Sequence, residues 1–287
     1  MRILRQSFRC FMIELRQRLA EYQTWTLFLI LCILLYQYTQ ETMSFANTVG
    51  YKVAPWFLPF ITSTRMLKVF VLTLYIPFVC TVPRITIIHD YIIIRSKHLP
   101  YYLGQCLYIV FTAIVYSFLV MFLPIILNLT HMEWNADWGK VIGTLSEPNL
   151  SVLNLETLHY SSSIVKHFTP LQAMFHSYCL MALSLLLIGL LVYIFNMITP
   201  KFHAGILVGT FFILFDFFLA TDIVYARWLW FSPLSWSKLS IIDFKHTTRN
   251  PTFTYCYRFC IIGIILSLVI LYALQLFKIK TKGGEEE

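Results

Sequence analysis

Long runs of apolar residues, interrupted by short polar stretches, make up most of this chain. A helix that crosses the hydrocarbon core of a bilayer needs roughly 20 mostly apolar residues, and six runs approach or reach that length. We expect each run to be helical, because backbone polar groups find no water partner in hydrocarbon. The predicted spans are Thr24–Thr39, Met66–Val82, Tyr101–Leu127, Ser177–Ile198, a run that starts at Ala204, and Phe259–Phe277. The pattern therefore predicts an all-α integral membrane protein in which residues 1–287 form one transmembrane domain.

The N-terminal segment, residues 1–23, has a different pattern. Its apolar residues recur at spacings of three and four, which places them on one face of a helix. These residues are Leu4, Phe8, Phe11, Met12, Leu15 and Leu19. Arg5, Arg9 and Arg16 lie along one border of that face. We predict an amphipathic elbow helix that lies in the headgroup plane and leads into the first span, the alternative being a simple membrane anchor.

The composition supports a membrane environment. Charged residues make up 13% of the chain, against about 25% in soluble domains, and 58% of the residues are hydrophobic. A soluble chain of this length could not bury so much apolar surface in one core. The net charge of +8 is spread around the apolar runs and forms no dense basic stripe, which favours a membrane over a nucleic acid as the partner.

The lysines and arginines predict the orientation. With both termini in the cytoplasm, the inner segments carry twelve of the 22 basic residues at a higher density than the outer segments. Residues 128–176 and 226–257 are then long outer loops, and residues 278–287 form a cytoplasmic tail. Six outer tryptophans are expected to form an interfacial belt. They are Trp56, Trp134, Trp138, Trp228, Trp230 and Trp236.

The segment Arg84–Pro100, between the second and third spans, is too apolar for a solvated loop and too charged for a span. It contains six isoleucines together with Asp90, Arg95 and Lys97. We predict a short helix here, parallel to the membrane on the cytoplasmic side, because the prolines at either end favour a helix boundary.

With these elements in place, the chain resembles the permeases of type-2 ATP-binding-cassette exporters of Gram-positive bacteria. The resemblance lies in the N-terminal helix, the six spans, the inner helix and the opening of the third span, "YYLGQCLYIVF". The stretch "FSPLSW" is also similar to a segment that precedes the last span in the family. Family members often carry a glutamate in the inner helix, where the nearest acid in this chain is Asp90.

The resemblance implies a mechanism and a set of partners. Two permeases, identical or different, pair in the plasma membrane, and two separate ATPase subunits that use ATP and magnesium dock beneath the inner helices. The cargo is an amphipathic peptide, antibiotic or lipid-like molecule. This chain lacks the GxxxxGK[ST] loop, so the ATPase must be a separate subunit. The predicted ATPase-coupling residues are Arg84, His89, Asp90, Arg95, Lys97 and His98.

Asp216 is the acidic residue that lies well inside a predicted span. Such residues are costly unless they are paired or hydrated, so they are candidates for function. The same span offers no base, and the partners considered are Asn196, Tyr193 or a water-filled path. A structural and a functional role stay equally open.

The sequence predicts neither a catalytic nor a metal site. The histidines of the outer loop have no close ligand spacing, and the seven cysteines match no zinc pattern and are expected to be inert thiols. A secondary transporter or channel, a membrane-embedded enzyme and a structural membrane subunit remain alternatives to the permease.

Overall fold

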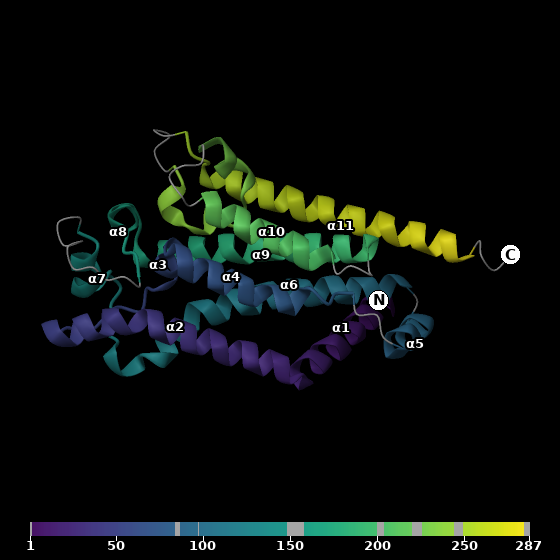
Figure 1. Ribbon diagram of the computed structural model, residues 1–287, viewed down its shortest axis with the longest axis horizontal. Helices are drawn as coiled ribbons and strands as arrows, with labels where there is room; N and C mark the ends of the chain where they lie inside the picture. Colours follow the sequence, from purple (N-terminus) through teal and green to yellow (C-terminus); the bar gives the residue numbers. More distant parts are fainter. Residues whose placement is uncertain are drawn as a thin grey trace.

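The computed structural model describes residues 2–83, 87–96, 98–147, 158–199, 204–219, 226–243 and 249–283. Within these ranges the chain is helical, and extended backbone pairs at a single bridge between Val53 and Met132. The α-helices are α1 (Arg2–Ala20), α2 (Tyr22–Val49), α3 (Leu58–Ser63), α4 (Arg65–Val79), α5 (Ile87–Ser96), α6 (His98–Leu127), α7 (Gly139–Leu145), α8 (Ser162–His167), α9 (Pro170–Ile198), α10 (Ala204–Leu219) and α11 (Phe253–Gly283). Short 3-10 turns at Leu129–His131, Ala226–Phe231, Ser235–Ser237 and Leu239–Ile241 join them. The long helices lie side by side in one bundle (Figure 1).

Three of the described helices are long and apolar enough to cross a membrane: α6, α9 and α11. A fourth candidate is the pair α1–α2, which passes the same test when both helices are taken together, although they meet at a bend of 68°. The prediction of an all-α protein with apolar helices suited to a membrane is thereby confirmed.

The second predicted span is shorter than its apolar run indicated, and the fifth is described only in part. Helix α4 has 15 residues, with Pro77 inside it, and α10 has 16. At 1.5 Å per residue, α4 is about 22 Å long, below the roughly 30 Å of a hydrocarbon core. The chain before α4 breaks at Thr64, whose backbone is extended, and residues 220–225 beyond α10 lie outside the described ranges. Six spans thus stay a prediction.

Helix α9 forms the centre of the bundle and packs against α6, α10 and α11. Gly189 allows its close contact with α6, since a Cβ atom at this position would lie 2.7 Å from the Ile109 side chain. Helix α11 is the most exposed of the three, and its outer face carries large apolar residues such as Ile262 and Val269. Apolar side chains on the outside of a bundle are expected where hydrocarbon is the solvent.

The two ends of the bundle differ. The start of α1, the helix α5 and the end of α11 lie at one end, and α3, α7 and α8 lie at the other (Figure 1). The predicted outer loop 128–176 therefore contributes folded structure: it contains α7 and α8, and α9 already begins at Pro170. We refer to these as the α5 end and the α7 end.

The predicted tryptophan belt is wrong for two of its six members. Trp236 is fully buried, its indole N–H donates to the Leu229 carbonyl at 2.8 Å, and its ring meets Phe259 edge-on. Trp138 is 9% exposed and donates to a backbone carbonyl at 3.0 Å. Both rings lie in the core because the loops fold back onto the helices, a packing that a local sequence pattern cannot reveal. Trp134 and Trp228 are exposed.

Candidate functional site

Helix α5 coincides with the inner helix expected between the second and third spans. It contacts α6 and lies at the same end of the bundle as the start of α1 and the end of α11 (Figure 1). Tyr91 and Ile94 are 70% and 79% exposed, and their i, i+3 spacing places them on one face. Arg95 is exposed beside them. Two large apolar side chains therefore project from the α5 end of the molecule.

The predicted coupling residues are only partly described. Arg95 is exposed near the end of α5, and His98 is partly buried at the start of α6. Arg84 and Lys97 lie outside the described residues, as do the side chains of His89 and Asp90. The structure thus describes a helix where the sequence predicts one but leaves the coupling roles of these residues as predictions.

Helices α1, α5 and α6 form one packed unit. Helix α1 crosses α6 at Gly104, where a Cβ atom would lie 2.7 Å from the Cys10 Cβ and 3.0 Å from the Ser7 carbonyl oxygen. Helix α5 in turn packs on α6. A displacement of α5 would therefore act on both α1 and α6.

The face of α1 that packs on α6 is partly polar. Glu14 is 1% exposed; the Gln105 Nε2 of α6 donates to its Oε2 at 3.3 Å, and the Arg18 Nε lies 3.7 Å from its Oε1. Leu4 and Phe8, from the predicted apolar face, are exposed instead. Helix α1 thus turns polar groups toward the bundle, and three of the six residues of its apolar stripe, Leu4, Phe8 and Leu19, are exposed, which fits an environment of lipid.

The buried acid Asp216 is paired with a residue that the sequence analysis missed. Its Oδ1 lies 3.0 Å from the Lys68 Nζ of α4, and both side chains are less than 10% exposed. The Ser235 hydroxyl, from the "FSPLSW" stretch, donates to the same oxygen at 2.7 Å. A buried carboxylate is expected to have such a base, and Lys68 is the only lysine in the second apolar run, so the signal was present in the sequence.

The Asp216 carboxylate also lies near the α7 end of the bundle. The described part of α10 ends at Leu219, and the carboxylate meets residues from the α7 end of the bundle. The network of Lys68, Asp216 and Ser235 joins α4 and α10 to the segment before α11.

Asn196, one of the partners considered for Asp216, has a different role. Its Nδ2 donates to the carbonyls of Cys80 and Val82 at 2.7 and 2.8 Å, and its Oδ1 accepts from the Gly205 N–H at 2.9 Å. The amide thereby joins the ends of α4, α9 and α10 at the end opposite Asp216. Because both the amide nitrogen and the amide oxygen of Asn196 are hydrogen-bonded within the protein, its role is structural.

The described residues contain no group of three or more His, Cys, Asp or Glu side chains that could hold a metal ion. All seven cysteines are free; Cys10 lies in α1, and the other six lie in α2, α6, α9 and α11 or at the end of α4.

Comparisons with protein-family models, with curated proteins and with solved structures give no match. The resemblance to type-2 exporter permeases therefore rests on the quoted stretches of sequence and on the order of the helices.

Proposed function

We propose that this chain is the transmembrane permease subunit of an ATP-driven exporter of the ATP-binding-cassette type. It pairs with a second permease and with two separate ATPase subunits in the plasma membrane, and it moves an amphipathic substrate out of the cell. In this proposal α1 is the elbow helix, α5 is the coupling helix, and both termini are cytoplasmic.

The observation that carries the proposal is the exposed face of α5. A helix at the same end of the bundle as the start of α1 and the end of α11 presents Tyr91 and Ile94 to its surroundings. Burying such a side chain against a partner is worth about 1.5–3 kcal/mol, so a receiving groove on an ATPase accounts for their exposure. Arg95 beside them supplies a polar contact at the rim.

The packing offers a route for the movement. A push on α5 acts on α6 directly and, through α6, on α1. Helix α6 in turn packs along α9, the centre of the bundle. The ATPases supply ATP hydrolysis with magnesium, and this chain supplies the moving helices and the path.

The proposal is tested by purifying a tagged chain in mild detergent from the cells that produce it. We expect a subunit with a GxxxxGK[ST] motif to accompany it in stoichiometric amount, with magnesium-dependent ATP hydrolysis. The variant Tyr91→Ser/Ile94→Ser removes the exposed apolar pair and should lose most of the bound ATPase. As the matched control, Trp134→Ser changes a residue that is 74% exposed at the opposite end and should retain it. Equal recovery of the ATPase with both variants would contradict the docking role of α5.

The buried ion pair favours a second candidate, a secondary transporter. Charged pairs within membrane proteins often mark ion or proton paths. A purified chain that accumulates substrate in vesicles under a proton gradient, without ATP or an ATPase, would support that function instead. Lys68→Met should then abolish accumulation.

A further inference from the structure

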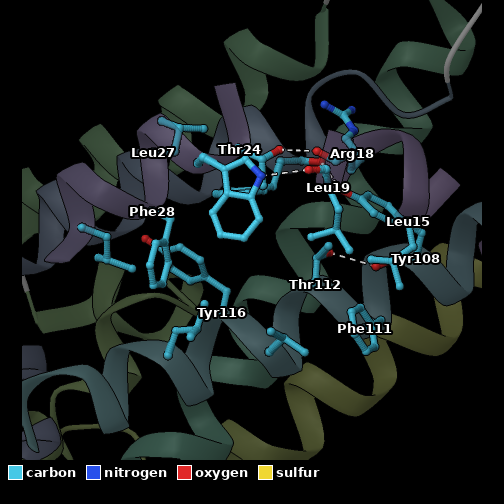
Figure 2. A pocket seen from close by; sticks show the side chains of 15 residues that line it. Leu15, Arg18, Leu19, Thr24, Leu27, Phe28, Tyr108, Phe111, Thr112 and Tyr116 are labelled. Carbon is cyan, nitrogen blue, oxygen red and sulfur yellow. Dashed lines mark hydrogen bonds between the residues drawn. The ribbon is translucent and has the colours of Figure 1, made fainter. Parts of the chain in front are cut away.

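A cavity of about 170 Å³ lies in the angle between α1 and α2, where both helices meet α6. Figure 2 shows its wall: Leu15 and Leu19 come from α1, Phe28 comes from α2, and Phe111 and Thr112 come from α6. Val115 and Leu119 of α6 continue the apolar lining. The cavity is separate from α5 and from the Lys68–Asp216 pair.

The angle that forms the cavity is held by hydrogen bonds. The Thr24 hydroxyl donates to the Arg18 carbonyl at 2.7 Å, and the Trp25 indole N–H donates to the Leu19 carbonyl at 2.9 Å (Figure 2). The last carbonyls of a helix otherwise lack partners, so these bonds both cap α1 and fix the entry into α2. The bend of 68° is thus built into the fold, and the cavity with it.

The mouth of the cavity faces apolar surroundings. Leu19 and Trp25 line it and are 48% and 59% exposed, and the apolar surface continues along α2 at Leu29 and Ile33. An apolar cavity of about 150 Å³ stays dry and accepts an apolar molecule the size of benzene. In a membrane, the apolar molecules at this mouth are lipid acyl chains, and a chain end of about six carbons matches the volume.

Exposed arginines beside the mouth of the cavity favour a lipid with an anionic headgroup. Arg16 is exposed and lies three residues before Leu19, on the same side of α1. Arg5 and Arg9 are exposed further along the helix, whereas Glu14, the only acidic residue of α1, is buried. Exposed bases attract anionic lipid headgroups, and the partly exposed Glu21 at the bend is paired with Arg18 at 3.4 Å.

We propose that the cavity between α1 and α2 binds the end of one acyl chain of an anionic phospholipid, whose phosphate lies beside Arg16. The lipid would fill the angle between α1 and α2 and hold α1 against the membrane. This lipid site is independent of the proposed ATPase contact, and it requires no transport activity.

The test uses the full-length chain in detergent with added phosphatidylglycerol, and native mass spectrometry counts the lipids that remain bound. We expect the wild type to retain one phosphatidylglycerol and to prefer it over phosphatidylcholine. Val115→Phe and Leu27→Phe fill the cavity from opposite walls and should lower the retained fraction about tenfold, a difference of about 1.4 kcal/mol. Ile114→Phe, the neighbouring exposed position on α6, is the matched control and should retain the lipid. Arg16→Gln should remove the preference for phosphatidylglycerol.

A measurement on the wild type tests the proposal even if the variants fail to fold. Phosphatidylglycerol with a photoreactive group at the acyl end should label residues of the cavity wall, such as Val115 and Phe28. Labelling spread over the outer face of α11 without any at the cavity would overturn the proposal. Retention of the lipid by folded Val115→Phe and Leu27→Phe, or an unchanged preference in Arg16→Gln, would also overturn it.

Discussion

At the scale of single residues, the buried ion pair shows what the sequence did and did not reveal. That Asp216 needs a partner follows from its apolar neighbours, and the sequence predicted this need. The partner could not be assigned, because Lys68 lies 148 residues away and the two meet only when α4 packs on α10. Trp236 is a similar case, since its burial depends on the return of the "FSPLSW" stretch into the bundle.

The pair also gives a prediction of stability. Removing one member of a buried pair leaves an uncompensated charge, which costs about 3–5 kcal/mol. We expect Lys68→Met and Asp216→Leu each to lower the apparent melting temperature in detergent. The double variant, with no buried charge, should recover most of the loss. A double variant that melts as low as the sum of the two single losses would show that the residues do not interact.

At the scale of elements, periodicity predicted helices well and their ends less well. The amphipathic pattern of residues 1–23 corresponds to α1, which ends one residue before Glu21. Helix α2, in contrast, runs ten residues beyond the predicted Thr39 and ends at Val49. The apolar run marks the part of a helix that suits a membrane, and the helix itself can continue into polar residues. Its end has a sequence signal: Gly50 has a left-handed φ of 75° and its N–H caps the helix, as glycine commonly does.

The crossing of α1 and α6 gives a prediction for this scale. Gly104→Ala places a Cβ within 2.7 Å of Cys10, so the two helices must separate. The buried Cys10 thiol should then react several-fold faster with a maleimide, as followed by mass spectrometry of the Cys10 peptide. Gly143→Ala is the control, because a Cβ there meets nothing within 4 Å. An unchanged rate at Cys10 would mean that α1 tolerates the extra atom where it lies.

At the scale of the whole molecule, composition predicted the class of protein. The scarcity of charge and the long apolar runs correspond to an all-helical bundle with helices that can cross a membrane. The fold of the α7 end was not predictable, because its short helices and 3-10 turns are too brief for periodicity to show. Neither the composition nor the fold identifies the function, because helical bundles of this kind occur in several classes of transporter. The exposed face of α5 favours the exporter permease among them.

The central claim is that α5 lies on the cytoplasmic side and meets an ATPase there. The most direct measurement places single cysteines at Tyr91 and Trp134, both exposed and at opposite ends, in a background without other cysteines. A membrane-impermeant thiol reagent is then applied to intact cells and to opened cells. The account predicts that Trp134→Cys is labelled in intact cells, and that Tyr91→Cys is labelled only after opening and is protected when the ATPase is bound. Labelling of Tyr91→Cys from outside intact cells would contradict the account.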